Sequence, residues 1–338
     1  RLDKRLDKRL VAPMNKRLPI VDISALVIDN RETLEFTKSA ELLYKALSEV
    51  GFAIIVGHQV AAKTILEMRN AVATVFETPR EILLRDKVVK GNYRGFVPLS
   101  FFTPNSGKGN ADQYEAWKLH NETDPNDQIC KHCNLYGPNK WPDIAEDIKT
   151  PVMNYWRELT RVSEYLIIAL CKTMRIDENF ILQCMKSPLT NMTLLNYPPT
   201  PPLSDTWGQH PHKDFNLLTL LAHDPVGGLE VRTLDDEWIT AECPPDGMVL
   251  NVGDMLELWS GGRLISTPHR VINRTGKHRQ SFPFFSKPRW DVIVKPLLEP
   301  LANFDRAPLH VGTSAANIWH SNWPDEISPD TTQHTNYN

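Results

Sequence analysis

Two residues of metal-binding types stand two positions apart in the stretch HPHKDFNLLTLLAHD, which spans residues 210–224. His212 and Asp214 precede an apolar run that is typical of a β-strand. Because alternate residues of a strand point to the same face, the imidazole and the carboxylate would be presented together. They would supply two ligands of a metal site, and a mononuclear site needs at least a third.

A third ligand is available in His269, which follows the glycine turn Gly261-Gly262 in the stretch STPHRVIN. Two histidines and one carboxylate on one face leave three coordination positions open, which is the arrangement that oxygenases use for Fe(II). His210 and His223 are also available, so local spacing alone does not select the ligands.

Arg279 and Ser281 form a second pair, ten residues after His269, in a run that reads as a strand. They would share one face of that strand, where a guanidinium fork beside a hydroxyl suits a carboxylate ligand. An arginine directed into a barrel interior needs an anionic partner to offset its desolvation. The alternative is an arginine at the rim that pairs with a surface carboxylate.

Three separated motifs thus occur in the order H-x-D…H…R-x-S: HKD at 212–214, SGGRLISTPHRV at 260–271 and RQSF at 279–282. This pattern resembles that of the 2-oxoglutarate- and Fe(II)-dependent dioxygenases, in the branch similar to isopenicillin N synthase. LPIVDIS and EVGFAIIVGHQV near the start, and LLNYPP before the β-rich part, are similar to segments of the same family. The resemblance extends over residues 18–325.

By this resemblance, His212, Asp214 and His269 are the expected iron ligands and form the catalytic centre. Their side chains would leave room for O2 and an oxo acid. Lys213 departs from the family, in which threonine is commoner between the two ligands. We expect Lys213 to point to the opposite face as a solvated strand residue, without disturbing the metal.

The resemblance also implies 2-oxoglutarate as a cosubstrate. Arg279 and Ser281 are expected to bind its distal carboxylate, with Tyr197 adding a hydroxyl and Asn196 beside it. The implied reaction is oxidative decarboxylation of 2-oxoglutarate to succinate and CO2, coupled to oxidation of a small-molecule substrate in specialised metabolism. Hydroxylation is the default outcome, and desaturation and ring formation are alternatives.

The pattern along the chain suits such a fold. Residues 88–140 read as long loops, and residues 143–174 carry a long helical pattern. Elements expected before them are a strand at 20–23, a helix at 36–50, a strand at 52–56 and a helix at 61–77. Short β-like runs alternate with turns from Leu189 to about Leu297, which is typical of a barrel or jelly roll: TLLNY, LLTLL, GLEV, EWITA, GMVLNV, MLELW, HRVIN, QSFPFF and DVIVK.

We therefore expect a mainly β fold with flanking α-helices. Its core would be a double-stranded β-helix of the jelly-roll or cupin-like type, with N-terminal helices packed on it. Four parts are expected along the chain: a flexible or vector-derived arm at 1–18, a helical and loop region at 19–175, the oxygenase core at 176–325 and a tail at 326–338.

The substrate pocket is expected where the irregular region meets the mouth of the barrel. An arginine would serve there as a cationic anchor within partly aromatic walls, which suits a carboxylate- or amide-bearing small molecule. The aromatic residues have the alternative of packing as core beneath a loop. The candidates are Arg94, Phe96, Phe101, Phe102, Tyr114 and Trp117.

Composition limits the class of partner. A net charge of -3 without a basic field argues against nucleic acid. No run of 18 apolar residues and no secretory signal is present, so no membrane partner and a cytoplasmic location are expected. Five cysteines favour reduced thiols, and the zinc-knuckle spacing of Cys130 and Cys133 lacks a second pair.

Three other functions remain open. An oxidase similar to isopenicillin N synthase would use the iron without 2-oxoglutarate, and Arg279 and Ser281 would then bind a substrate carboxylate. The likeness of SGGRLISTPH to the ethylene-forming branch suggests fragmentation of 2-oxoglutarate itself. A jelly roll that binds a ligand without catalysis is the alternative outside enzymology.

Overall fold

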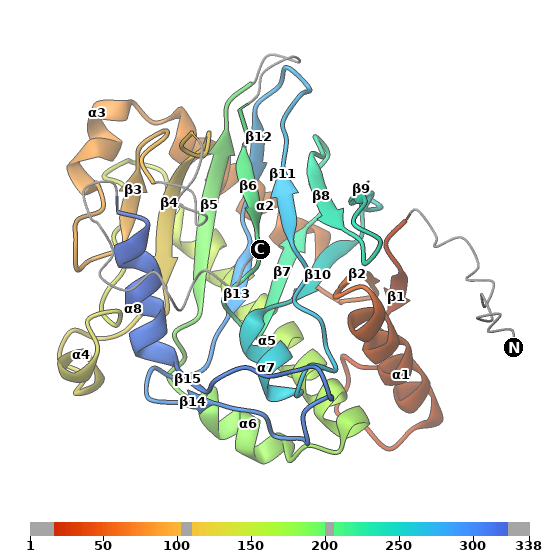
Figure 1. Cartoon of the computed structure of the whole chain (residues 1–338). Helices are drawn as coiled ribbons and strands as arrows, with labels where there is room; N and C mark the ends of the chain where they lie inside the picture. The colour runs from red at the N-terminus through yellow and green to blue at the C-terminus, as the bar shows by residue number, and fades with distance from the viewer. Residues whose placement is uncertain (1–16, 103–109, 200–205, 324–338) are drawn as a thin grey trace, which may run out of the picture.

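Two β-sheets face each other in the computed structural model, which describes residues 17–102, 110–199 and 206–323. Helices cover the outer face of the larger sheet, and the smaller sheet stands on its other side (Figure 1). This is the mainly β fold with flanking helices that the sequence predicts. Residues 1–16 of the expected arm and the expected tail at 326–338 lie outside the described residues.

The larger sheet has nine strands, and all of its pairs are antiparallel except β1 with β2. β12 (Arg279–Ser281) pairs only with one end of β5 and therefore stands outside the linear order of the other eight strands. In spatial order the other strands are β1 (Ile20–Asp22), β2 (Phe52–Val56), β10 (Met248–Val252), β7 (Leu218–Ala222), β13 (Phe284–Ser286), β5 (Asn191–Tyr197), β4 (Glu115–His120) and β3 (Gly95–Val97).

The smaller sheet has four antiparallel strands, with β6 at one edge. Its strands in order are β6 (Gln209–His212), β11 (His269–Val271), β8 (Leu229–Arg232) and β9 (Trp238–Thr240). A separate two-stranded pair is formed by β14 (Ile293–Val294) and β15 (Leu309–His310).

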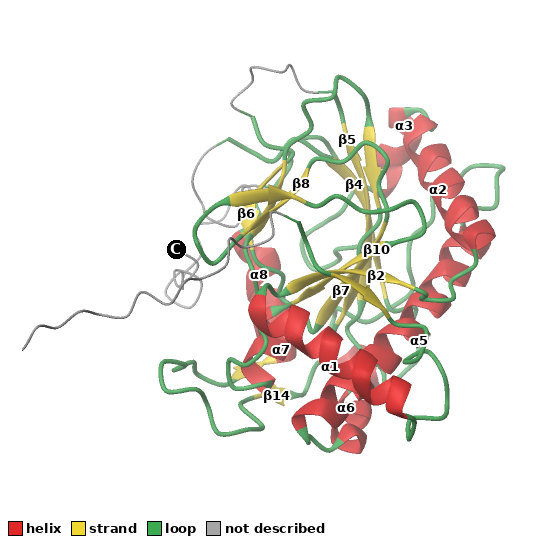
Figure 2. Ribbon diagram, turned by 90° about the vertical axis from the view of Figure 1, so that its right-hand side faces the viewer, coloured by secondary structure: helices red, strands yellow, loops and turns green. Residues whose placement is uncertain are grey.

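Two long helices lie against the outer face of the larger sheet, as Figure 2 shows. α5 (Lys149–Met174) packs on β7 and β13, and α2 (Ala62–Glu77) packs on α5, β5 and β12. No helix among the described residues is both long enough and apolar enough to cross a membrane. The remaining helices are α1 (Leu34–Glu49), α3 (Arg80–Leu83), the short 3-10 helix η1 (Leu84–Asp86), α4 (Ile129–His132), α6 (Glu178–Cys184), α7 (Asp254–Trp259) and α8 (Val311–Ser321).

Buried side chains fall into two clusters, one on each face of the larger sheet. The outer cluster joins the sheet to the helices and includes Trp117 and Leu194. The inner cluster lies between the two sheets and includes Ala116, Leu195 and Val231. Because neighbouring strand residues alternate between these clusters, a residue's position in its strand decides which of the two cores it enters.

Two expectations about local structure are corrected. The run MLELW, expected as β, is the helix α7, whose six residues are all buried. A short apolar run bounded by turns has the same pattern whether it becomes a buried helix or a buried strand. Residues 88–140, expected as long loops, contain the strands β3 and β4 and the short helix α4.

Gly253 at the start of α7 allows close packing that alanine would prevent. A Cβ atom there would lie 1.9 Å from Oδ1 and 2.4 Å from the carbonyl oxygen of Asn216. We expect Gly253→Ala to lower the free energy of unfolding by about 3 kcal/mol, because the backbone at Asn216 or Gly253 would have to move to make room for the added methyl group. Gly276→Ala is the control: nothing lies within 4 Å of its Cβ, and its positive φ should cost only about 1 kcal/mol. Denaturant titration measures both, and equal losses would contradict the prediction.

Candidate metal centre

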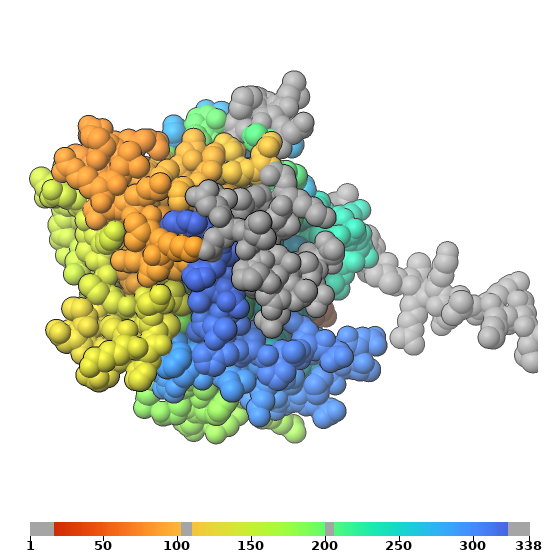
Figure 3. Space-filling model, turned by 60° about the vertical axis from the view of Figure 1, so that its left-hand side comes forward, coloured from red at the N-terminus to blue at the C-terminus, as the bar shows by residue number. Residues whose placement is uncertain are grey.

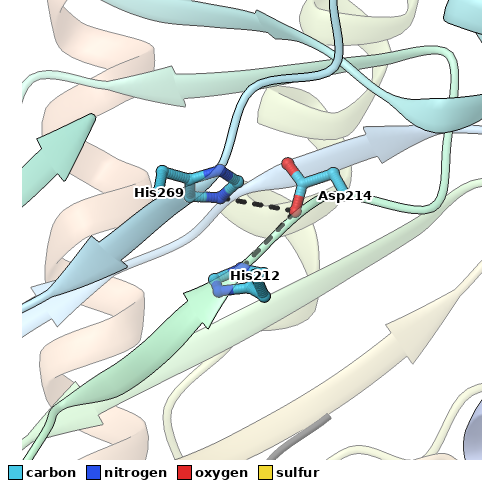
Figure 4. Close-up of side chains that lie close together, drawn as sticks. All are labelled: His212, Asp214 and His269. Carbon is cyan, nitrogen blue, oxygen red and sulfur yellow. Dashed lines mark ion pairs between the residues drawn. The ribbon is translucent and has the colours of Figure 1, made fainter. Parts of the chain in front are cut away.

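Three side chains of metal-binding types meet between the two sheets. His212 ends β6 and His269 begins β11, and the two residues are paired directly in the antiparallel register. Asp214 lies two residues beyond the end of β6 and points back toward both rings (Figure 4). The pairing of two strands therefore brings together ligands that are far apart in the sequence.

The three donors are close enough to share one ion. Nε2 of His212 lies 3.6 Å from Oδ1 of Asp214, and Nε2 of His269 lies 3.5 Å from the same oxygen. All three donor atoms lie within 4.8 Å of one another, and no other such group of three occurs in the described part of the chain. Two imidazoles and one carboxylate on one side of an ion leave its other side open, as Fe(II) oxygenases require.

Backbone carbonyls orient both imidazole rings. Nδ1 of His212 lies 2.8 Å from the carbonyl oxygen of His210, and Nδ1 of His269 lies 3.2 Å from that of Thr267. A carbonyl can only accept, so each Nδ1 carries a proton and each Nε2 is the ring nitrogen available to a metal. Phe52 packs edge-on against the ring of His269 and limits its rotation.

Two polar residues hold the carboxylate of Asp214 by its other oxygen. Thr219 Oγ1 donates to Oδ2 over 2.5 Å, and Asn251 Nδ2 donates to the same atom over 2.8 Å. Oδ1 is thereby left to face the histidines. Sequence reasoning missed both donors, although each is a polar residue within an otherwise apolar strand, and that signal could have identified them.

The protonation of the group suits metal binding. Burial and the neighbouring charge of His269 lower the pKa of His212 to about 4, so its ring is neutral at pH 7. Burial alone would raise the pKa of Asp214, but His269, His212 and the hydrogen bond from Thr219 hold that pKa below its ordinary value. Burial opposes protonation of His269, but Asp214 raises the pKa of this ring. A divalent cation would therefore meet an anionic oxygen on Asp214 and a neutral nitrogen on His212, and would displace a proton from His269.

A buried arginine lies behind this centre. Arg279 faces Tyr197 across β12 and β5, with its guanidinium 4.9 Å from the centre of the tyrosine ring. Its Nε donates to the carbonyl of Gly227 over 2.7 Å and lies 2.7 Å from Oδ2 of Asp224. Its Nη1 is buried without a hydrogen-bond partner among the described residues. A buried, unpaired guanidinium N–H is costly, and a ligand carboxylate would satisfy it.

Tyr197 and Ser281 stand on the same face as Arg279, since Ser281 is two residues further along β12. Burial raises the pKa of Tyr197 to about 12, so its hydroxyl stays protonated and can donate to an anion. Asp224 was not among the expected site residues. Its place after a strand-like run gave no signal that distinguished it from a turn residue.

The expected place of Asn196 in the 2-oxoglutarate pocket is corrected. It pairs in register with Gln280 and therefore points to the opposite face from Tyr197 and Arg279. Its Nδ2 donates to Glu115 over 2.8 Å, and Glu115 in turn pairs with Arg80 at 2.7 Å. Asn196 therefore belongs to a polar group under the helices and not to the cofactor pocket.

Two of the expected substrate contacts are corrected for the same reason. Phe96 and Trp117 face each other across β3 and β4, are fully buried, and belong to the outer core beneath the helices. The indole N–H of Trp117 donates to the carbonyl of Lys140 over 3.1 Å. Neither side chain reaches the space between the sheets.

Of the other expected substrate residues, the aromatic ones lie on or near the inner side. Tyr114 packs edge-on against Tyr197, with ring centres 6.0 Å apart, and Phe102 belongs to the inner core with Phe101 packed beside it. Arg94 is buried and donates to the carbonyl of Leu135 over 2.5 Å.

The remaining polar candidates lie apart from the group of three ligands. His210 is paired with Asp112, at 2.5 Å from Nδ1. Lys213, expected as a solvated strand residue, lies after the end of β6 and is half-buried, with Nζ 4.0 Å from Oε2 of Glu257. Cys130 and all four other cysteines are free thiols.

Comparisons with known proteins agree with this geometry. The family model of the 2OG-Fe(II) oxygenase superfamily matches residues 189–288, and the N-terminal model of non-haem dioxygenases in morphine synthesis matches residues 18–144. A homoarginine-6-hydroxylase of Oryza sativa is 31% identical over 83% of this chain and 89% of its own length. The 2-oxoglutarate-dependent dioxygenase thnC of Trichoderma harzianum is 29% identical over 79% of this chain and 83% of its own.

Solved structures show the same fold. A putative 2OG-Fe(II) oxygenase family protein of Caulobacter crescentus superposes with a TM-score of 0.75 at 26% identity, covering 88% of this chain and 96% of that one. A full-length protein of Neurospora crassa, solved in complex with alpha-KG, superposes with a TM-score of 0.76 at 21% identity, covering 88% and 94% of the two chains.

Proposed function

Since this chain belongs to the 2OG-Fe(II) oxygenase superfamily, we propose that His212, Asp214 and His269 are the ligands of its Fe(II). The enzyme is a 2-oxoglutarate-dependent dioxygenase that oxidises a small molecule, with Fe(II), 2-oxoglutarate and O2 as its requirements. The observation that supports the ligand assignment is the convergence of three donors within 4.8 Å, with both Nδ1 atoms engaged elsewhere.

We assign the distal carboxylate of 2-oxoglutarate to Arg279, with Ser281 and Tyr197 as further donors. The buried, unpaired Nη1 of Arg279 supports this assignment, because a carboxylate is the partner that a guanidinium prefers. Asp224 contacts the guanidinium at Nε, which leaves Nη1 available for a ligand.

When bound, the iron supplies the oxidative chemistry, in which 2-oxoglutarate and O2 give succinate and CO2 while the substrate is oxidised. The protein holds the metal ligands in position and shapes the surroundings of the centre. Thr219 and Asn251 fix Asp214 so that one carboxylate oxygen faces the ion. The inner core, which includes Phe52 and Val231, keeps bulk water from the centre.

The finer features of the reaction are proposals. Hydroxylation is the default outcome, and desaturation or ring formation would depend on how the substrate is held. We propose a carboxylate- or amide-bearing small molecule as substrate, no nucleic acid or membrane partner, and a cytoplasmic location, which five free thiols support. The four expected parts of the chain likewise remain a prediction.

Stoichiometry tests the proposed function. Purified protein with Fe(II) should consume O2 and form succinate only when 2-oxoglutarate is added, in a ratio near one to one. O2 consumption without 2-oxoglutarate would favour the oxidase alternative, and ethylene in the headspace would favour fragmentation of the oxo acid. Binding of 2-oxoglutarate that needs no Fe(II) and never leads to turnover would favour a non-catalytic jelly roll.

Removal of the hydroxyl that holds Asp214 should weaken metal binding. We expect Thr219→Val to reduce Fe(II) affinity by about 10- to 100-fold, since partners that orient a ligand contribute on that scale. Anaerobic titration with Fe(II) measures the change. Thr37→Val, on the exposed side of α1, is the matched control and should bind like the wild type. Unchanged affinity in Thr219→Val would show that Asp214 is oriented by other contacts.

A further inference from the structure

Two lysines that the proposed reaction does not use lie on the inner face of the larger sheet. Lys118 in β4 alternates with Trp117 and Leu119, which enter the outer core, so its side chain points between the sheets. Its Nζ lies 3.4 Å from Oγ1 of Thr193 on the neighbouring strand. Nothing in the proposed metal and oxo-acid pockets requires this amine.

Lys287 reaches the same face from the end of β13. Its Nζ donates to Oδ1 of Asn191 over 2.5 Å, and Asn191 is paired in register with both Phe285 and His120. Lys118 and Lys287 thus approach one region from the two strands that flank β5, and each is only partly accessible to solvent.

A row of paired residues connects this region with the metal centre. Thr219, which holds Asp214, is opposite Phe285, and Phe285 is opposite Asn191. Thr219 and Asn191 are two strand spacings apart, so their backbones are separated by about 10 Å. The residue that Lys287 contacts and the residue that holds Asp214 therefore lie on one inner face, two strand spacings apart.

The charges of these two lysines have no carboxylate counter-ion in the part of the chain that the structure describes. Among the described residues, no carboxylate lies within ion-pair distance of either amine. Burial lowers the pKa of Lys118 to about 7, with the charge of Lys287 adding to the effect. Burial likewise lowers the pKa of Lys287 to about 8, against the attraction of Asp214. A partly desolvated cation without a counter-ion is costly, and an anionic ligand would remove that cost.

The neighbours of the two lysines add no negative charge. His120 is held neutral, because burial and the positive charges of Arg94, Lys287 and Lys118 keep its pKa well below the ordinary value. The ring of Trp319 from α8 lies over Lys118, with the ring centre 4.6 Å from Nζ. In Figure 3, α8 is drawn in dark blue and lies beside the orange and yellow parts of the chain, which include the segments before β3 and after β4.

We propose that Lys118 and Lys287 bind a carboxylate of the enzyme's small-molecule substrate, beneath Trp319. The proposal deepens the function proposed above and rests on it for the reaction. Each ammonium uses one of its three donors on Asn191 or Thr193, so donors remain for the two oxygens of one carboxylate. The oxidised carbon would lie several bonds away from this group, because about 10 Å separates the lysine region from the support of Asp214.

Matched probes test the proposal. Carboxylic acids of increasing chain length, each with its primary amide and its phosphonate, are added to the anaerobic Fe(II)–2-oxoglutarate enzyme, and perturbation of its absorption band measures binding. The metal-free protein is tested in parallel through the shift of its melting temperature. At least one acid should bind, and more tightly than its amide and its phosphonate. Lys118→Met and Lys287→Met should each weaken that binding by at least about tenfold.

Lys63→Met provides the control, because it removes one positive charge from an exposed position on α2. It should bind the acid like the wild type. Equal binding of acids and amides, tighter binding of phosphonates, no binding of any acid, or acid binding unchanged in both pocket variants would each overturn the proposal. Formation of the Fe(II)–2-oxoglutarate band separates the two claims: without the band the proposed function fails, whereas a normal band with no preference for acids refutes only the lysine site.

Discussion

Replacement of His212 by alanine is expected to abolish iron retention. Only three donors converge among the described residues, so the variant would offer one imidazole and one carboxylate to the ion. Loss of a direct ligand should exceed the 10- to 100-fold effect of losing an orienting partner, so we expect Fe(II) affinity to fall by more than about 100-fold. Metal analysis after anaerobic loading and desalting measures the retained iron, and turnover should be lost with it.

A second histidine serves as the control for this variant. His132 is exposed and stacks on Trp290, far along the chain from the three ligands. His132→Ala should retain iron like the wild type. The melting temperature of metal-free His212→Ala reports whether the variant is folded, which keeps loss of metal distinct from loss of structure. Iron retention at the wild-type level in folded His212→Ala would refute the ligand assignment.

Arg279→Ala is expected to separate binding of the oxo acid from binding of the metal. The guanidinium offers a buried, charge-assisted donor to a carboxylate, and such bonds contribute about 1.5 to 3 kcal/mol each. We expect the affinity for 2-oxoglutarate to fall by about 100-fold, while Fe(II) affinity stays within about threefold. Titration of the Fe(II) enzyme with 2-oxoglutarate measures the first quantity and Fe(II) titration the second.

Two further variants sharpen the interpretation of Arg279→Ala. Arg279→Lys keeps the positive charge but loses the planar fork, so it should recover only part of the affinity. Arg232→Ala removes a more exposed arginine that pairs with Asp236 and should behave like the wild type. If Arg279→Ala bound 2-oxoglutarate normally but lost affinity for an acidic substrate, the assignment of this arginine would move to the substrate.

The local pattern of the sequence was sufficient for most strands of the core. Runs such as LLTLL and GMVLNV became β7 and β10, and the helices expected at 36–50 and 61–77 became α1 and α2 with shifts of one or two residues. MLELW failed because a run of five apolar or buried positions has no period long enough to distinguish a helix from a strand.

The sequence predicted the site residues whose role follows from their chemical type. It was less successful for residues whose role depends on how the strands and helices pack. His212, Asp214 and His269 were chosen by donor type and order, and the structure brings them together. Phe96 and Trp117 were chosen as aromatic residues near the mouth, but the face of a strand that turns inward depends on which layer covers it. That information is absent from a local pattern.

Strand alternation could have revealed the lysine pair. In EAWKLH the apolar Trp117 and Leu119 alternate with Lys118 and His120, which is the pattern of a strand with one polar inner face. The stretch was expected as loop because Gly, Asn and Pro are frequent around it. Lys287 follows Ser281 and Phe285 at even spacing, which continues the inner face of β12 and β13 in the same way.

The position of β6 at the edge of the smaller sheet has a consequence for the behaviour of the protein in concentrated solution. Within the described ranges β6 pairs with a strand on one side only, and an open strand is a template onto which another chain can add and aggregate. Pro211, in the middle of the strand and exposed, brings no N–H of its own, and the N–H of neighbouring His210 is already donated to Oδ1 of Asp112 over 2.9 Å. Pro211 and the contact between His210 and Asp112 therefore both discourage intermolecular β-pairing at the strand that carries His212.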